Sequence, residues 1–133
     1  MVAKTIMGKV KAPRKNALGR DIARTMISQD YCHLPVVDES GSVVGIVSEF
    51  DLLKAVKAGK DLEKITAEEL MSPKVVTVNE DEPIEGVIDI MTTQYMITLP
   101  VVKNGKLVGV INRRNILHNL VDHEYQEYFM TIQ

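Results

Sequence analysis

The sequence contains an internal repeat. Leu-Pro-Val-Val occurs at residues 34–37 and again at residues 99–102, an offset of 65 residues. In each copy a polar turn with a glycine leads into a second apolar run, Val-Gly-Ile-Val at residues 44–47 and Val-Gly-Val-Ile at residues 108–111. Such a duplication predicts two similar units packed about a pseudo-twofold axis, with two related crevices between them. The residues that carry the function are therefore expected at positions where the two copies differ.

The spacing of apolar residues predicts the order strand, helix, strand, strand, helix in each unit. In the second unit we expect a strand over residues 74–78, a hairpin around residues 103–106, and a last helix that begins near Asn112. Its first helix is expected to begin with Pro83 at the first helical position. The apolar stripe of that helix comprises Ile84, Val87, Ile88, Met91 and Tyr95.

The first unit repeats this order more loosely. We expect a basic first strand over residues 9–12 and a hairpin that turns at residues 39–41. Asn16 is the expected cap of a helix whose apolar stripe is Leu18, Ile22 and Met26. A second helix is expected to end at Gly59, and residues 61–70 form a linker with helical propensity.

These elements predict a mixed α/β (α+β) fold with one unit over residues 1–68 and the other over residues 69–133. Two helices cannot cover both faces of a three-stranded sheet, so the units are expected to pack sheet against sheet. Apolar surface left on the helices favours a homodimer. The tail, residues 121–133, is interpreted as a helix or arm that packs on a partner subunit, since it holds Tyr125, Tyr128, Phe129 and Met130 among acids.

Composition narrows the classes of partner. A net charge of −2 favours neither nucleic acid nor membrane. Residues 1–27 carry seven Lys or Arg against one acid, which indicates either a solvated basic surface or attraction of an anion. One cysteine, Cys32, allows no internal disulfide and fits a reducing cytoplasm. We see no signal peptide and no apolar run near the roughly 20 residues that a membrane span needs.

The candidate ligand-binding residues lie where the second strand of each hairpin is followed by a helix. It includes Gly45, Ser48 and Asp51 in the first unit, and Gly109, Asn112 and Asn115 at matching positions in the second. A glycine lets a ligand approach the backbone, and a helix N-terminus suits a phosphate. A carboxylate accepts hydrogen bonds from adjacent ribose hydroxyls. The same spacing is also that of a plain capping box, and the two interpretations do not exclude each other.

Leu-Pro-Val-Val, a polar turn and Gly-Ile-Val-Ser-x-x-Asp-Leu-Leu, repeated in tandem, resemble a pair of cystathionine-β-synthase (CBS) domains, the Bateman module. The resemblance extends from about Thr5 to the C-terminal region. It implies a regulatory, non-catalytic module that binds AMP, ADP, ATP or S-adenosylmethionine in two clefts between the repeats. It also implies a homodimer that signals to an effector protein through a change of shape.

The resemblance further implies which residues share each cleft. Carried over by position, the first cleft combines Ser48 and Asp51 with Met71, Val76, Met96 and Ile97. The second combines Asn112, Arg113, Arg114 and Asn115 with Ile6, Lys11, Tyr31 and Cys32. The first keeps Ser and Asp and has an apolar wall, so it is the favoured nucleoside site. The second has Asn in place of Ser and Asp; it favours phosphate over ribose or stays empty.

Other constellations are weaker. His118 and His123 are not on one helix face, and His33 and Cys32 lie elsewhere in the sequence, so no metal site or other cofactor is expected. No arrangement of nucleophile and base predicts an enzyme. Two alternatives stay open. One is a structural dimerisation module with empty clefts, and the other is nucleic-acid binding by residues 1–27 with Arg113 and Arg114.

Overall fold

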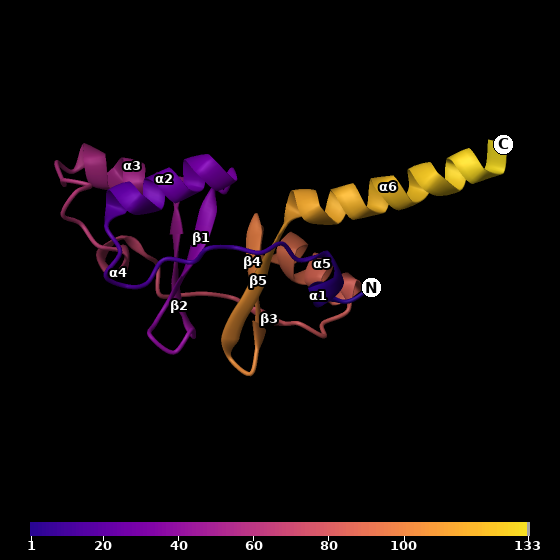
Figure 1. Cartoon of the computed structure of the whole chain (residues 1–133), viewed down its shortest axis with the longest axis horizontal. Coiled ribbons are helices and arrows are strands. Elements are labelled where there is room, and N and C mark those ends of the chain that lie inside the picture. Colours follow the sequence, from indigo (N-terminus) through magenta and orange to yellow (C-terminus); the bar gives the residue numbers. More distant parts are fainter. Residues whose placement is uncertain (133) are drawn as a thin grey trace.

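The computed structural model describes residues 1–132, and describes side chains as far as residue 122. Figure 1 shows the order of the elements along the chain. They are α1 (Ala3–Ile6), α2 (Gly19–Gln29), β1 (His33–Val37), β2 (Val43–Ser48), α3 (Glu49–Lys57), α4 (Ala67–Leu70), β3 (Val78–Asn79), α5 (Ile84–Thr93), β4 (Thr98–Lys103), β5 (Lys106–Asn112) and α6 (Arg113–Ile132).

The two hairpins have the same register, which confirms the repeat and the mixed α+β fold. β1 pairs antiparallel with β2, and β4 pairs antiparallel with β5. Pro35 lies opposite Ile46, and Pro100 lies opposite Val110. Each hairpin also shifts its register directly after the first valine that follows the proline. The duplicated sequence therefore specifies duplicated strand pairing.

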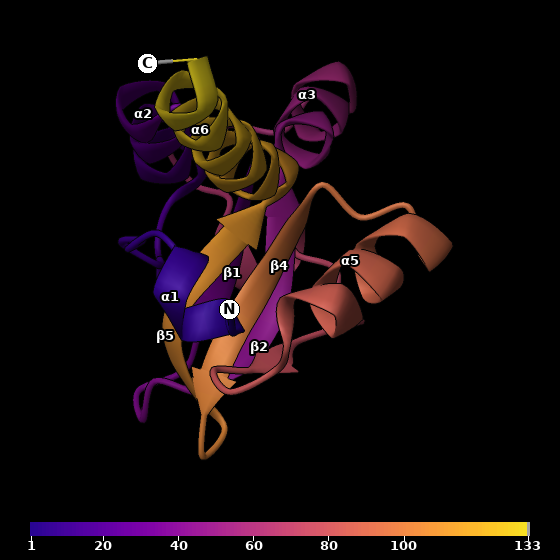
Figure 2. The same ribbon diagram turned by 90° about the vertical axis from the view of Figure 1, so that its right-hand side faces the viewer.

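The two sheets lie face to face. The hairpin turns touch at one end, where the Leu107 amide donates to the Gly41 carbonyl over 3.0 Å and Ser42 bridges to Lys106. The sheets stand side by side in Figure 1, and one lies behind the other when the molecule is turned by 90°. Figure 2 also shows α2, α3 and α6 gathered at the end of the strands away from those turns.

The first strand predicted for each unit is wrong in extent. No strand forms over residues 9–12, and only Val78 of residues 74–78 belongs to β3, which pairs parallel with β4. The chain crosses between the sheets in both places. Gly8 bridges to Val110 of the second unit, and Ser72 bridges to Ile46 of the first. A segment that pairs with one sheet cannot also run along the other, so the strands are short.

This crossing exchanges two short helices between the cores. Ala3 and Ile6 of α1 lie in the core of the second unit, although α1 precedes the first. Ala67 and Leu70 of α4 lie in the core of the first unit, although α4 precedes the second. The boundary at residue 68 stays a prediction about the chain, and the hydrophobic cores do not follow it.

The start of α2 differs from the expectation. Leu18, rather than Asn16, is the N-cap, and no side chain caps the helix. The linker supplies the missing partners, because the Gly19 and Arg20 amides donate to the carbonyls of Ile65 and Leu62 over 2.8 and 2.9 Å. Residues 61–70 therefore hold α2 in place. Of this linker, only residues 67–70 form a helix.

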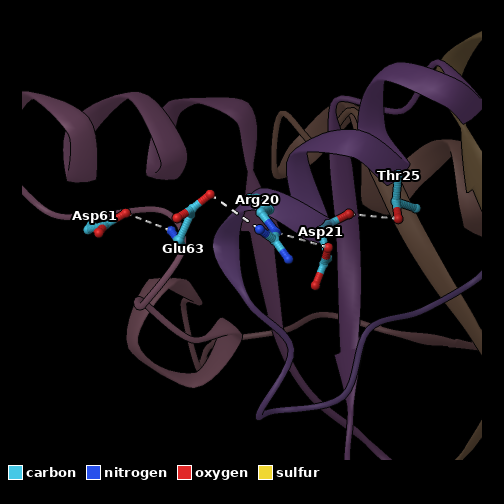
Figure 3. Close-up of polar contacts among 5 residues, drawn as sticks. All are labelled: Arg20, Asp21, Thr25, Asp61 and Glu63. Atoms are coloured by element: carbon cyan, nitrogen blue, oxygen red, sulfur yellow. Dashed lines mark hydrogen bonds and ion pairs between the residues drawn. The ribbon is translucent and has the colours of Figure 1, made fainter.

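Figure 3 shows the polar contacts at the outer side of this junction. The Arg20 guanidinium lies between Glu63 of the linker, at 3.2 Å, and Asp21 of its own helix, at 3.7 Å. The Glu63 amide in turn donates to an Asp61 carboxylate oxygen over 2.9 Å, which shapes the turn. These side chains are exposed, so the contacts orient the linker more than they stabilise it.

The amphipathic helix of the second unit is confirmed over most of its length. Ile84, Val87 and Met91 of α5 are buried. Pro83 is the N-cap, one position before the helix rather than its first residue. Tyr95 follows the helix with a φ of 53° and is 92% exposed, so its place in the apolar stripe is wrong. The tail side chains, Tyr125 to Met130, lie outside the residues whose side chains are described.

Candidate functional site

Ser48 and Asp51 form a complete capping box at the start of α3. The Ser48 hydroxyl oxygen accepts from the Asp51 amide over 3.2 Å. One Asp51 carboxylate oxygen accepts from the Ser48 amide over 2.7 Å and from the Ser48 hydroxyl over 3.0 Å. The box follows from the sequence, since Ser48 ends β2 in an extended conformation and Asp51 lies three residues on. It occupies one carboxylate oxygen of Asp51.

Asn112 and Asn115 form the corresponding box at the start of α6. The Asn115 amide N–H donates to the Asn112 side-chain oxygen over 2.8 Å, and the Asn112 backbone N–H donates to the Asn115 side-chain oxygen over 3.0 Å. The backbone geometry is thus kept while the negative charge is absent. Both pairs are partly buried, so the capping interpretation and a role beside a ligand stay compatible.

A cavity of about 450 Å³ lies between the two units, beside the Asn112 box. It is lined by residues from both repeats: Met26, Ile27, Asp30, Tyr31, Cys32, Glu49, Ile97, Thr98, Asn112, Arg113 and Arg114. This volume lies within the range of small-molecule sites, about 300–1,000 Å³. Five of the residues predicted for the second cleft meet here, together with Ile97 of the first. None of the residues of the Ser48–Asp51 box lines this cavity.

A wider, more open groove adjoins the cavity at Tyr31. It is lined by Lys9, Val10, Lys11, Gln29 and Tyr31. The Tyr31 hydroxyl donates to the Lys9 carbonyl over 3.0 Å, and burial raises the pKa of that phenol. Tyr31 therefore lines both the groove and the cavity. The groove that contains Lys11 adjoins the cavity that contains Arg113.

The remaining predicted residues lie in packed regions. Ile6 is 6% exposed within the core of the second unit. Val76 and Met96 pack against that core, and Met71 packs against the core of the first unit. The wall predicted for the first cleft, Ile97 excepted, is therefore engaged with the two cores. The ligand role of every one of these side chains stays a prediction.

Sequence reasoning missed five residues of the cavity wall, namely Met26, Ile27, Asp30, Glu49 and Thr98. For two of these residues, the repeat pairs the position with one in the other copy. Thr98 occupies the position of His33, and Glu49 occupies the position of Arg113. For Asp30 the sequence carried no signal, because this residue enters the wall through a left-handed turn, with a φ of 57°, at the end of α2.

His33 lies opposite Ser48 in the pairing of β1 with β2. Its Nδ1 is buried and makes no hydrogen bond within the described part of the chain. Burial lowers the pKa of His33, while the negative charges of Asp51 and Glu49 act in the opposite direction. Burial therefore favours the neutral form of the imidazole.

Large apolar side chains are exposed on three helices. Ile27 of α2, with Leu53 and Val56 of α3, borders a groove of about 240 Å³. On α6, Leu117 and Val121 border a second groove of about 260 Å³. Leu53 and Leu117 are equivalent in the repeat, so the two repeats expose apolar side chains at equivalent positions.

Two searches of the described residues concern other kinds of site. No group of three His, Cys, Asp or Glu side chains is placed to hold a metal ion there. None of the helices described combines the length and the hydropathy required to span a bilayer.

Comparison with known proteins identifies the same module. Residues 15–58 and 67–122 match the CBS domain family. The chain is 35% identical over 97 residues to L-aspartate semialdehyde sulfurtransferase of Methanocaldococcus jannaschii, which covers 72% of this chain. The chain spans only 18% of that enzyme's length. It spans half of another relative, an uncharacterized protein of Methanopyrus kandleri to which it is 33% identical over 73% of its own length.

Solved structures agree with the fold. The CBS domain pair of protein MJ0100, in complex with 5′-methylthioadenosine and S-adenosyl-L-methionine, is 30% identical with a TM-score of 0.79. That match covers 92% of this chain and 98% of the other. The crystal structure of AcuB from Vibrio cholerae is 25% identical, covers 96% of each chain and has a TM-score of 0.87.

Proposed function

Because the chain belongs to the CBS domain family, we propose that it is a regulatory, non-catalytic module that binds one adenosine-containing ligand between its repeats. The ligand classes are AMP, ADP, ATP and S-adenosylmethionine. The observation that carries the proposal is the cavity of about 450 Å³ that both repeats line. A relative at 30% identity binds adenosyl compounds as a CBS domain pair, which supports the ligand class.

Ligand binding is proposed to act by changing the angle between the repeats. The hairpin turns touch at one end of the sheets, and the cavity lies between residues at the opposite ends of the same strands. A ligand that touches both repeats in the cavity therefore favours one relative orientation over another, as differential affinity for two states requires. An effector protein would read this orientation.

The proposal places the ligand in the second cleft rather than the first. The cavity includes Tyr31, Cys32, Asn112, Arg113 and Arg114. Met71, Val76 and Met96 pack against the cores instead. Ser48 and Asp51 are then proposed to hold α3 in place, with a ligand role only if the first cleft opens.

A homodimer in the cytoplasm completes the proposal. The exposed apolar faces of α3 and α6 provide matching surfaces for a second copy. Replacing both Leu53 and Leu117 by lysine is expected to give monomers, because a charge on each face costs burial at the interface. Sedimentation equilibrium of the wild type and the double variant measures this; a wild-type monomer at high micromolar concentration contradicts the dimer.

Calorimetric titration with AMP, ADP, ATP and S-adenosylmethionine tests the ligand site. Ile97→Trp places a large ring in the cavity and is expected to weaken binding by about tenfold or more. Tyr95→Trp is the matched control, because it introduces the same ring two residues away on a side chain that is 92% exposed. Absence of binding by all four compounds, with the fold intact by circular dichroism, would leave a dimerisation module with an empty cavity.

A further inference from the structure

Two equivalent positions face each other across the cavity. The Glu49 amide donates to the Cys32 carbonyl over 3.0 Å, and the Arg113 amide donates to the Ile97 carbonyl over 3.1 Å. All four residues line the cavity. Glu49 and Arg113 are each the first residue of a helix, α3 or α6. The cavity is therefore bordered by two equivalent helix starts, one from each repeat.

The charges break this symmetry. The wall contributed by the first repeat carries two acids, Asp30 and Glu49, and the wall contributed by the second carries Arg113 and Arg114. Glu49 stands where the other repeat has Arg113, so one wall is anionic and the other cationic. A symmetric cavity would accept a ligand in two opposite orientations, whereas this one distinguishes its two ends.

These four charged side chains make no ion pair with the described side chains. Within residues 1–122, none of Asp30, Glu49, Arg113 and Arg114 takes part in an ion pair. Asp30, Glu49, Arg113 and Arg114 are all exposed. Arg113 and Arg114 also stand in the first turn of α6, where a positive charge opposes the helix dipole. Their position disfavours the helix but suits an anionic group, carboxylate or phosphate, which arginine binds through two parallel hydrogen bonds.

Resting on the proposed function, we propose that the cavity selects an adenosyl ligand that carries both a cationic group and a carboxylate, in preference to a nucleotide phosphate. The carboxylate lies at Arg113 and Arg114, and the cationic group lies at Asp30 and Glu49. A nucleotide with only negative charge gains from the arginines but is repelled by the two acids. Glu49 and Arg113 are thus the specificity-determining pair.

Four probes separate these contributions by calorimetry on the full chain. S-Adenosylmethionine carries a sulfonium, an ammonium and a carboxylate; S-adenosylhomocysteine lacks the sulfonium charge; 5′-methylthioadenosine lacks the amino-acid head; AMP carries a phosphate. The expected order of affinity is S-adenosylmethionine, S-adenosylhomocysteine, then methylthioadenosine and AMP. We expect at least about a tenfold preference for S-adenosylmethionine over AMP, the size of effect that close charge pairs produce.

Charge reversal tests the pair itself. Glu49→Lys is expected to weaken S-adenosylmethionine and to strengthen AMP, each by about tenfold, whereas Arg113→Glu weakens both. The double variant Glu49→Arg/Arg113→Glu exchanges the two charges of the pair while Asp30 and Arg114 stay in place, so it is expected to recover part of the loss of S-adenosylmethionine affinity. Lys57→Glu is the matched control, because it reverses an exposed charge at the far end of α3 and leaves the cavity wall unchanged.

The outcomes are distinguishable. Binding of AMP as tight as that of S-adenosylmethionine, or a preference for S-adenosylmethionine over AMP that Glu49→Lys does not change, overturns this inference and leaves the proposed function intact. Absence of binding by all four probes overturns both. Circular dichroism melts of each variant establish that a loss of affinity is not a loss of folded protein.

Discussion

The two helix starts provide the sharpest comparison within the molecule. Both α3 and α6 begin with reciprocal hydrogen bonds over a three-residue spacing, one made by Ser48 and Asp51 and the other by Asn112 and Asn115. The Asp51 box has three hydrogen bonds and a charge, whereas the Asn115 box has two and none. The same backbone thus supports two different electrostatic environments.

The surroundings of the two boxes differ more than the boxes do. The cavity of about 450 Å³ lies beside Asn112, while Met71, Val76 and Met96, predicted to accompany Asp51, pack against the cores. The residue type most suited to ribose therefore does not lie at the open site. A helix-start motif indicates where a ligand can approach, but packing decides whether there is room.

The largest expected effect concerns the glycine before each box. A Cβ on Gly109 would lie 2.8 Å from the Gly8 carbonyl oxygen, which belongs to the bridge between Gly8 and Val110. A Cβ on Gly45 would overlap the Met71 side chain, which is flexible. We expect Gly109→Ala to lower the free energy of unfolding by about 1–3 kcal/mol and Gly45→Ala by less.

Urea unfolding of the two variants measures this difference. Met71→Ala combined with Gly45→Ala is the control, because it removes the side chain that the new methyl group meets. An equal or larger loss of unfolding free energy in Gly45→Ala would contradict the expectation that a clash with the Gly8 backbone costs more than a clash with the flexible Met71 side chain.

A smaller effect is expected from exchanging the chemistry of the boxes. Asp51→Asn is expected to cost about 0.5–1 kcal/mol, because the carboxylate that caps α3 loses its charge. Asn115→Asp is expected to stabilise the protein by about 0.3–1 kcal/mol, since it places a negative charge in the first turn of α6 beside two arginines. Thermal unfolding of the single variants checks the opposite signs; a change in the same direction for both contradicts this account of the boxes.

The smallest effect is a pH dependence present in only one repeat. The pKa of His33 is lowered from its ordinary value of 6.5, so the unfolded chain binds a proton more readily than the native protein. This group contributes stability above pH 6.5 that is lost as the pH falls through the lowered pKa. His33→Thr introduces the residue found at the equivalent position, Thr98, and is expected to flatten the decline in stability below pH 6.5.

The free energy of unfolding is measured at several pH values between 5 and 8. Its slope against pH isolates the contribution of His33, because the change in packing does not vary with pH. Asp51 and Glu49 oppose the lowering, so the slope is expected to be modest. An unchanged slope in His33→Thr would assign the acid sensitivity to other groups.

Much of the fold was predictable because its signals are local. The repeated hairpins, the polar turns with Gly41 and Gly105, and the Ser48–Asp51 spacing each depend on a few neighbouring residues. The helix pattern of α5 was equally clear until Tyr95, where a left-handed residue ends the periodicity. Such features are read from spacing without knowledge of the rest of the chain.

The errors arise where distant segments compete for the same partners. Residues 9–12 and 74–77 have strand-like composition, but the bridges of Gly8 and Ser72 to the opposite sheets keep them from extending along a strand. Asn16 has a capping side chain, but carbonyls of Leu62 and Ile65 already accept from the start of α2. Which cleft holds a ligand stays a prediction; Met71, Val76 and Met96 are partly buried against the cores. Local sequence does not contain that information.

The exchange of α1 and α4 has a consequence for a lone repeat. A single unit cut from this chain would carry a short helix that packs in a core it lacks. Its own core would lack the helix that the other unit supplies. Two such units would close each other reciprocally, which is the arrangement of a domain-swapped dimer. The full chain is thus equivalent to a swapped pair joined by a tether, and its halves are expected to melt as one cooperative body rather than in sequence.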